Sequence, residues 1–219
     1  MELPDVLREL GARPGERVLD LASPKLLAVA LGRRGIDVTS VDELPSEIET
    51  WRRLAPAEPH VRFQTGDGRA LAHPAESFDH AYSVSVLEHI AGDGDEAALR
   101  ELARVVKRGG RVVLTLPYTE TYWEEWRDRP VYVDHGETDN RYFFARCYDD
   151  ERLARLLSAA PALKVVASRV ARLCPMAVPA AWERFFPWLV PLGPLLGLVL
   201  REREGGKGGV IRLTLVKSV

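Results

Sequence analysis

Short, compact apolar runs recur along the first hundred or so residues of the chain. They predict strands at 16–22, 36–42, 61–65, 78–86 and 111–117, and several of these runs are apolar throughout instead of alternating. Continuously apolar strands are typical of a parallel sheet whose two faces are both covered by helices. The pattern therefore predicts an α/β architecture.

Stretches with helical character separate the apolar runs. They predict helices at 24–34, about 45–55, 95–107 and 149–159. Ser23 suits the N-cap of the first of these helices, and Pro24 suits its first helical position. Strands and helices thus alternate along the chain, as in sheets whose neighbouring strands are joined by crossover helices.

The second half of the chain is less regular. Residues 118–147 are rich in Tyr, Trp, Asp and Arg without a clear period, and strands at 163–170 and 210–217 follow. These two strands predict a terminal hairpin with an expanded loop. A long irregular stretch in a compact domain is usually functional, so we expect 118–147 to form a lid over an acceptor pocket. The alternative for its aromatic residues is a hydrophobic cluster beneath a long loop.

A hydrophobic, proline-rich insertion occupies 173–204. Its segment 185–200 carries no charge, but it is short for a membrane span and its prolines would break a helix. Three roles stay open for 182–200: a buried flap over the acceptor site, a homodimer interface, or a patch that dips into a lipid surface. We find no internal repeat and no domain boundary, so residues 1–219 are expected to form one domain.

Composition and charge narrow the classes of function. The chain is 46% hydrophobic and 28% charged, with a formal net charge of -2, so we expect no nucleic-acid partner. The two cysteines, Cys147 and Cys174, lack a CxxC spacing, which argues against a zinc site, another metal site or a disulfide framework. The N-terminus lacks a signal-peptide pattern, so the cytoplasm is the expected compartment, with membrane contact at most peripheral.

Polar residues follow four consecutive strands of the predicted sheet. They lie at 20–23, at Asp42, at 66–68 and at 83–89. Each alone is explained as a helix cap or a turn, but in an open parallel sheet ligands bind at the carboxyl ends of the strands. Asp42 lies about 20 residues after the first strand, where an acidic side chain accepts hydrogen bonds from both hydroxyls of a ribose. The four sites together indicate a crevice for a nucleoside.

Specific motifs occur between Phe63 and Pro117. They are GD-x-x-x-L-x-x-x-x-x-SFD, a VLEH after the fourth strand, and a helix that ends in K-x-GG. This segment resembles the small-molecule methyltransferase family of class I fold, and 142–157 is similar to the aromatic-and-arginine segment of its members. The resemblance implies a Rossmann-like α/β fold: a mostly parallel seven-stranded sheet with an antiparallel terminal hairpin and helices on both faces. It also implies S-adenosylmethionine as cofactor and S-adenosylhomocysteine as product.

The resemblance assigns the adenosine half of this cofactor to the second and third strands. Asp42 is expected to bind the ribose. Asp67, with the backbone of Gly68 and Arg69, is expected to meet the adenine.

The methionine half is assigned to the first and fourth strands. The resemblance places Asp20 and the backbone of Ala22, Ser23 and Lys25 against the methionine moiety. It places Ser83 and the neighbouring main chain at the end of the fourth strand against the amino group of that moiety.

The first loop departs from the family pattern LD-x-G-x-G-x-G. Residues 19–25 read Leu-Asp-Leu-Ala-Ser-Pro-Lys and contain no glycine. Two hypotheses stay open: the protein is a non-catalytic scaffold that has lost the cofactor, or the turn is rebuilt around Ser23 and Pro24. Lys25 opposes the helix dipole unless a carboxylate lies nearby, which the methionine end of the cofactor would supply. Together with Asp42 and Asp67, this favours a working cofactor site.

The expected activity is methyl transfer to O, N or C of a small or lipid-like metabolite. Positioning and exclusion of water supply most of the rate of such a transfer, and a base is needed if the acceptor carries a proton. The candidate bases are His89, His135 and Tyr118. The alternative function is a methyltransferase-like partner protein without catalysis.

Overall fold

The computed structural model describes residues 2–56, 58–131, 137–138, 140–172, 203–204 and 208–218. His135, one of the candidate bases, lies outside the described residues. So does the segment 182–200, for which three roles were left open. The strands are β1 Arg17–Leu21, β2 Asp37–Asp42, β3 Val61–Thr65, β4 Phe78–Val84, β5 Val106–Tyr118, β6 Trp123–Arg127, β7 Glu137–Thr138, β8 Arg141–Cys147, β9 Leu163–Arg172, β10 Arg203–Glu204 and β11 Gly209–Lys217.

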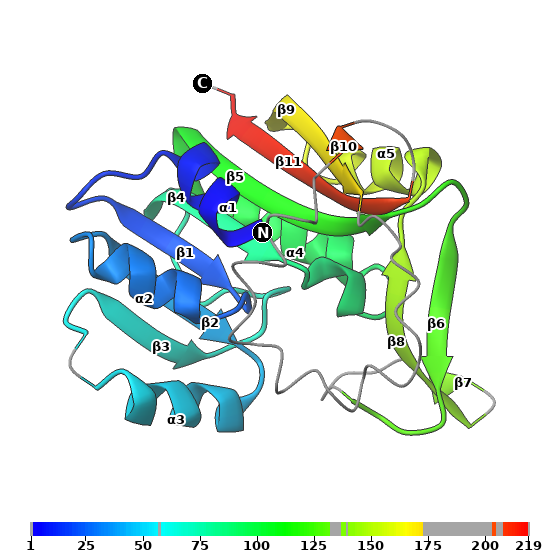
Figure 1. The fold of residues 1–219 in the computed structure, drawn as a ribbon, viewed down its shortest axis with the longest axis horizontal. Coiled ribbons are helices and arrows are strands. Elements are labelled where there is room, and N and C mark those ends of the chain that lie inside the picture. Colours follow the sequence, from blue (N-terminus) through cyan, green and yellow to red (C-terminus); the bar gives the residue numbers. More distant parts are fainter. Residues whose placement is uncertain are drawn as a thin grey trace.

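One large twisted sheet organises the molecule (Figure 1). Its strand order is β10-β9-β11-β5-β4-β1-β2-β3. The neighbours from β3 to β5 are all parallel, whereas β11 is antiparallel to both β5 and β9. This is the mostly parallel sheet with an antiparallel terminal hairpin that the sequence predicted, and the two-residue β10 extends it by one short edge strand.

The interiors of β1 and β2 are buried without alternation. In β1 every residue after Arg17 is buried, and in β2 every residue after Asp37. A strand covered on both faces has no exposed side, so polar residues concentrate where the strands end. The sheet therefore gathers Asp20, Asp42 and their neighbours at one edge.

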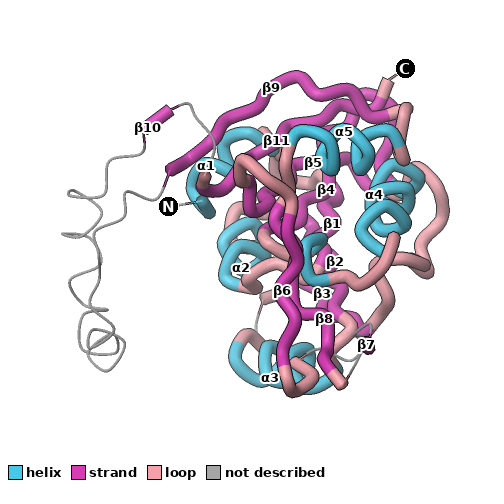
Figure 2. Tube along the Cα trace, turned by 90° about the vertical axis from the view of Figure 1, so that its right-hand side faces the viewer, coloured by secondary structure: helices cyan, strands magenta, loops and turns pink. Residues whose placement is uncertain are grey.

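Helices cover both faces of the sheet (Figure 2). They are α1 Glu2–Leu10, α2 Leu26–Gly32, α3 Pro45–Leu54, the 3-10 helix η1 Leu87–His89, α4 Gly94–Val105 and α5 Asp150–Ser158. Helices α1 and α2 pack on one face, in a cluster that contains Leu10 and Leu31, and α4 and α5 pack on the other, in a cluster that contains Leu99 and Leu156.

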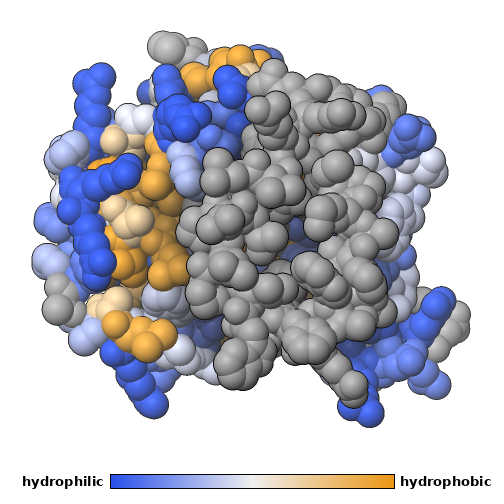
Figure 3. Space-filling view, in the orientation of Figure 1, coloured by the Kyte–Doolittle hydropathy of each residue, from blue (hydrophilic) through white to orange (hydrophobic). Residues whose placement is uncertain are grey.

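One apolar side chain of α2 faces outward. Leu26 is 62% exposed, and Figure 3 shows hydrophobic side chains gathered on the side of the molecule where Figure 1 draws α2. Of the helices in the described part of the chain, none is long and apolar enough to cross a membrane.

Residues 118–147 differ from the irregular lid that the sequence predicted. They contain a second, antiparallel sheet in the order β6-β8-β7, which projects from the end of β5 (Figure 1). Its strands read WEEWR and RYFFARC, and their charged and aromatic residues give no clean two-residue period. These strands form because β6 pairs with β8, although the local sequence does not predict either strand.

Two boundaries also differ from the sequence prediction. Helix α2 begins at Leu26 instead of Pro24, and its N-cap is Lys25, which makes no side-chain capping bond. Strand β5 begins at Val106, directly after α4, so the Gly109-Gly110 pair lies inside a strand. Gly110 fits there because a Cβ would lie 2.2 Å from the carbonyl oxygen of Asp79.

Candidate cofactor cavity and acceptor wall

A cavity of about 360 Å³ lies at the carboxyl ends of β1 to β4. The strand order reverses between β1 and β4, which is where open α/β sheets bind ligands. The volume is within the range of small-molecule pockets. Its lining comes from four strand ends: Leu21, Ala22, Ser23, Pro24 and Lys25 after β1; Asp42, Glu43, Leu44 and Glu47 after β2; Gly66, Asp67, Gly68 and Arg69 after β3; Val84, Ser85, Val86, His89 and Ile90 after β4.

The first loop keeps the backbone shape of a glycine turn without a glycine. Ala22 has a φ of 51°, in the left-handed region, and its N–H donates to the Val41 carbonyl at 2.7 Å. This is the first position at which family members carry glycine. The chain also approaches itself closely nearby, since a Cβ on Gly68 would lie 2.8 Å from Leu21 Cδ1. The turn is therefore rebuilt around Ala22, at the cost of a strained backbone conformation.

Ser23 does not cap α2, contrary to the sequence prediction. Its hydroxyl donates to the Leu21 carbonyl at 3.3 Å and accepts from the Val84 N–H at 2.9 Å. Ser23 thus ties the loop after β1 to the end of β4. The side chain fixes the wall of the cavity where the sheet order reverses.

Asp20 stabilises the loop after β1 through hydrogen bonds. Its carboxylate is fully buried and accepts from the Ser40 hydroxyl at 2.6 Å and from the Ser23 N–H at 3.1 Å. Burial raises the pKa of Asp20, and the nearby Lys25 ammonium opposes this rise. Asp20 is not among the described residues that line the cavity, so its placement indicates support of the loop instead of ligand contact.

Lys25 points into the crevice between β1 and β2. Its Nζ donates to Asp42 Oδ2 at 2.8 Å and to the Ser23 carbonyl at 3.0 Å, and Asp20 Oδ2 lies 3.9 Å away. From the sequence, the methionine end of a cofactor was expected to supply a carboxylate near Lys25. In the structure, the carboxylates near Lys25 are those of Asp42 and Asp20.

Asp42 ends β2 and lines the cavity, as the sequence predicted for its position. Its Oδ1 accepts from the Leu44 N–H at 3.0 Å, and its Oδ2 accepts from Lys25. Glu47, in the first turn of α3, lines the same side of the cavity. This side therefore presents carboxylate oxygens, which accept hydrogen bonds from hydroxyl groups.

The loop after β3 presents Asp67, Gly68 and Arg69 to the cavity. Asp67 Oδ1 accepts from the Arg69 N–H at 2.8 Å, and the Arg69 guanidinium pairs with the same carboxylate at 3.0 Å. These hydrogen bonds from Arg69 lower the pKa of Asp67, which stays ionised at neutral pH. The structure thus brings all three expected residues of this loop to one wall.

Ser85 lines the cavity in place of the expected Ser83. Ser83 is buried within β4 and donates its hydroxyl to the Leu21 carbonyl at 3.2 Å. Ser85 follows the end of β4 with a φ of 53°, which turns the chain over the strand end. The structure thus places the main chain next to Ser83, but not the Ser83 side chain, in the cavity lining.

His89 lines the cavity from η1. Its Nδ1 lies 2.7 Å from the Phe144 carbonyl, which only accepts, so Nδ1 carries the proton and Nε2 is the basic nitrogen. Burial lowers the pKa of His89, and the bond to Phe144 partly offsets this effect. His89 is therefore neutral at pH 7, as a general base must be before it accepts a proton.

The second sheet forms a wall beside His89. The register of β6 and β8 shifts where Glu125 pairs with Ala145 and Trp126 with Phe143, so Phe144 is an extra residue in β8. Such a bulge redirects backbone groups, and here the Phe144 carbonyl accepts from His89. The Phe144 ring also lies edge-on to His89, with ring centroids 5.0 Å apart.

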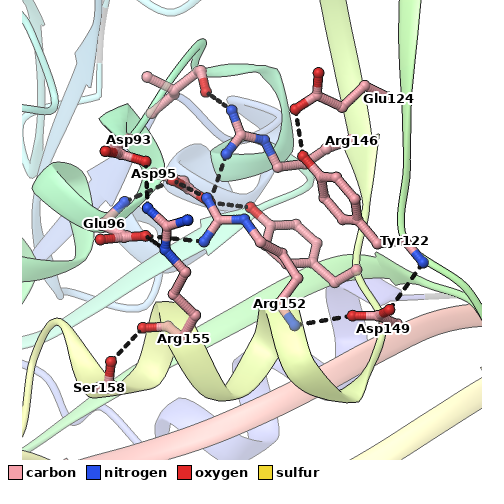
Figure 4. Close-up of polar contacts among 12 residues, drawn as sticks. Asp93, Asp95, Glu96, Tyr122, Glu124, Arg146, Asp149, Arg152, Arg155 and Ser158 are labelled. Atoms are coloured by element: carbon pink, nitrogen blue, oxygen red, sulfur yellow. Dashed lines mark hydrogen bonds and ion pairs between the residues drawn. The ribbon is translucent and has the colours of Figure 1, made fainter.

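A buried ionic network fixes β8 against α4 and α5 (Figure 4). Asp95 of α4 is fully buried and pairs with Arg146 of β8 at 3.1 Å and with Arg152 of α5 at 2.9 Å. It also accepts from the Tyr148 hydroxyl at 2.8 Å. Arg146 in turn donates to the Ile90 carbonyl at 2.7 Å, next to His89. These roles were not predicted from the sequence, although the aromatic-and-arginine segment 142–157 was the available signal.

Tyr118 lies away from the cavity, contrary to its expected role as a base. Its hydroxyl donates to Asp150 in the first turn of α5, and its ring is buried at the end of β5. Tyr118 also pairs through its backbone with Tyr148. The start of α5 thus provides the partner of the Tyr118 hydroxyl. Among the described residues, His89 is the expected base that the structure brings to the cavity.

The same architecture occurs in a solved methyltransferase structure. The Burkholderia thailandensis 1,6-didemethyltoxoflavin-N1-methyltransferase, solved with bound 1,6-didemethyltoxoflavin and S-adenosylhomocysteine, matches with a TM-score of 0.61 over 99% of this chain and 76% of that chain. The identity of 19% means that this likeness shows the fold alone. The strand order and this likeness define a Rossmann-like class I fold, which confirms the sequence prediction.

Residues 19–114 match a family model described as a methyltransferase domain. The matched segment runs from β1 into β5 and contains the loops that line the cavity. The match covers less than half of the chain, and it agrees with the resemblance noted in the sequence.

Two curated relatives are similar over part of their length. A demethylmenaquinone methyltransferase of Beutenbergia cavernae is 37% identical over 109 residues, which cover 49% of this chain and 43% of the relative. A 2-methyl-6-phytyl-1,4-hydroquinone methyltransferase of Synechocystis sp. is 32% identical over 130 residues, which cover 57% of this chain and 37% of the relative. The similarity thus spans less than half the length of each relative.

Proposed function

We propose that this protein is an S-adenosylmethionine-dependent methyltransferase whose acceptor is a small, lipid-like quinol or phenol. The observation that carries the proposal is the cavity across four strand ends, with Asp42 and Asp67 on its walls. The family match supports the reaction class. The names of the two relatives, which describe a demethylmenaquinone and a phytyl hydroquinone methyltransferase, support the acceptor class.

The lining residues fit a nucleoside joined to an amino acid. The Asp42 carboxylate suits the vicinal hydroxyls of a ribose, since a carboxylate offers two adjacent acceptor oxygens. The loop at Asp67 and Gly68 suits an adenine, with a carboxylate and close-lying backbone. We expect the backbone from Ala22 to Lys25 and the turn at Ser85 to face the amino-acid end.

When bound, the cofactor supplies a methyl group on a positively charged sulfur, which is already activated for transfer. The protein's part is to orient the acceptor, exclude water and remove a proton. A phenol hydroxyl has a pKa of about 10, so a base within reach raises the fraction of reactive oxygen. His89 fits this role, because the Phe144 carbonyl holds its proton on Nδ1 and leaves Nε2 basic.

The acceptor class also agrees with the apolar part of the lining. Val86 and Ile90 lie on the same stretch as His89, beside the wall that β8 provides.

The role of 182–200 as an interface or a lipid-binding patch stays a proposal. Replacing Leu195 and Leu196 by Asp should abolish association with liposomes if that patch binds lipid, and unchanged flotation would contradict it.

A non-catalytic partner protein is the second candidate. The ion pair between Lys25 and Asp42 favours it, because a protein cation already takes one acceptor position of the carboxylate that the ribose needs. The strained Ala22 in place of glycine points the same way.

Isothermal titration calorimetry distinguishes the two candidates. The wild type and Asp42→Asn are titrated with S-adenosylmethionine and with S-adenosylhomocysteine. Asp37→Asn is the matched control, because it changes the same strand at its other end, where Asp37 pairs with the half-exposed His60. Micromolar binding by the wild type and the control, weakened at least tenfold in Asp42→Asn, is the result we expect. Absence of binding by the wild type would favour the partner protein.

A further inference from the structure

Lys25 is a buried cation in the wall of the proposed cofactor cavity. Its side chain is 1% exposed, and Asp42 and Ser23 provide its hydrogen-bond acceptors at 2.8 and 3.0 Å. An ammonium removed from water is stable only where oxygens replace its hydration. The consequence for ligands is that one acceptor position on the Asp42 oxygen that faces Lys25 is already taken.

We propose that Lys25 is an internal counter-ion that holds Asp42 in the ligand-free protein and that a diol-bearing ligand must displace. Lys25 thereby sets the affinity of the cavity for its cofactor. The inference rests on the proposed function, because it concerns the same carboxylate and the same ligand.

Both oxygens of Asp42 carry a hydrogen bond before a ligand arrives. Oδ1 accepts from the Leu44 N–H at 3.0 Å, and Oδ2 accepts from Lys25 at 2.8 Å. The second distance is typical of a charge-assisted hydrogen bond, which is roughly twice as strong as a neutral one. When a ribose hydroxyl replaces Lys25 at Oδ2, Asp42 loses a charged donor and gains a neutral one. The ligand therefore binds less tightly than it would to an Asp42 carboxylate without a counter-ion.

The structure also provides a second position for the displaced ammonium. Asp20 Oδ2 lies 3.9 Å from Nζ, beyond hydrogen-bond length, and the Ser23 carbonyl stays within reach. The lysine stem is long and flexible, and a short movement toward Asp20 would close that gap. Lys25 can therefore release Asp42 without losing a carboxylate partner.

The test compares Lys25→Met with Lys25→Arg in calorimetric titrations with S-adenosylhomocysteine. Methionine keeps the approximate length of the side chain and removes its charge, whereas arginine keeps the charge. We expect Lys25→Met to bind at least tenfold more tightly than the wild type, and Lys25→Arg to bind no more tightly. The thermal unfolding of ligand-free Lys25→Met should occur at a lower temperature, because Asp42 loses its counter-ion.

Equal or weaker binding by Lys25→Met, while the wild type binds, would overturn the inference and leave the proposed function intact. Binding by neither protein would overturn the proposed function and the inference with it. If Lys25→Met does not fold, the same comparison is made between Asp20→Asn and the double variant Asp20→Asn with Lys25→Met. That background removes the second buried carboxylate and keeps the test decisive.

Discussion

Replacing Asp95 by Asn tests whether the buried ionic network holds the acceptor wall in place. Asp95 is 0% exposed and neutralises the guanidinium groups of Arg146 and Arg152 at 3.1 and 2.9 Å. Arg146 already has a buried Nε without a hydrogen-bond partner among the described residues. Removing one partner of a buried ion pair costs about 3–5 kcal/mol. In a chain of this length, that corresponds to a fall in melting temperature of roughly 6 to 20 °C.

The assay is thermal unfolding followed by circular dichroism. The matched control is Asp93→Asn, because Asp93 lies in the same segment and pairs with Arg155 at 2.7 Å, but its side chain is 68% exposed. An exposed pair contributes about 1 kcal/mol or less, so the control should melt within a few degrees of the wild type. Equal melting temperatures for Asp95→Asn and Asp93→Asn would refute the claim that the network stabilises the position of β8.

Three further predictions concern single residues of the site. Ala22→Val should lower the free energy of unfolding by at least ~1 kcal/mol in a denaturant titration, because a branched side chain fits poorly at a φ of 51°, whereas Ala22→Gly should not lower it. His89 has a pKa lowered by burial, so its contribution to stability should be present above pH 6.5 and be lost as the pH falls through the folded-state pKa. A ring that titrates above pH 6.5 by NMR would contradict this. Tyr118→Phe should change turnover less than about threefold, since its hydroxyl binds Asp150 outside the cavity; a loss of a hundredfold would restore it as a base.

The sequence predicted the main sheet because its strands are buried on both faces. The compact run 16–22 and the β-branched run 36–42 indicate strands from the local sequence alone. The position of Asp42 at a strand end followed from the same pattern, and the structure places it in the cavity wall. The second sheet was missed because β6 and β8 mix charged and aromatic residues, and their order comes from pairing with each other.

Side-chain directions could not be predicted from the local sequence. Lys25 reaches Asp42 because β1 and β2 are neighbours in the sheet, a relation between residues 17 positions apart. Ser85 replaces Ser83 in the lining because the backbone enters the left-handed region directly after β4, at a residue that is not glycine. Both features depend on the assembled sheet end and not on propensity.

A crystal structure of the protein with S-adenosylhomocysteine tests the central claim most directly. We expect the ribose hydroxyls on the Asp42 carboxylate, the adenine beside Asp67, and the Lys25 ammonium moved away from Asp42 toward Asp20. An empty cavity in which Lys25 still contacts Asp42, in crystals soaked with a large excess of the ligand, would contradict the proposed cofactor site.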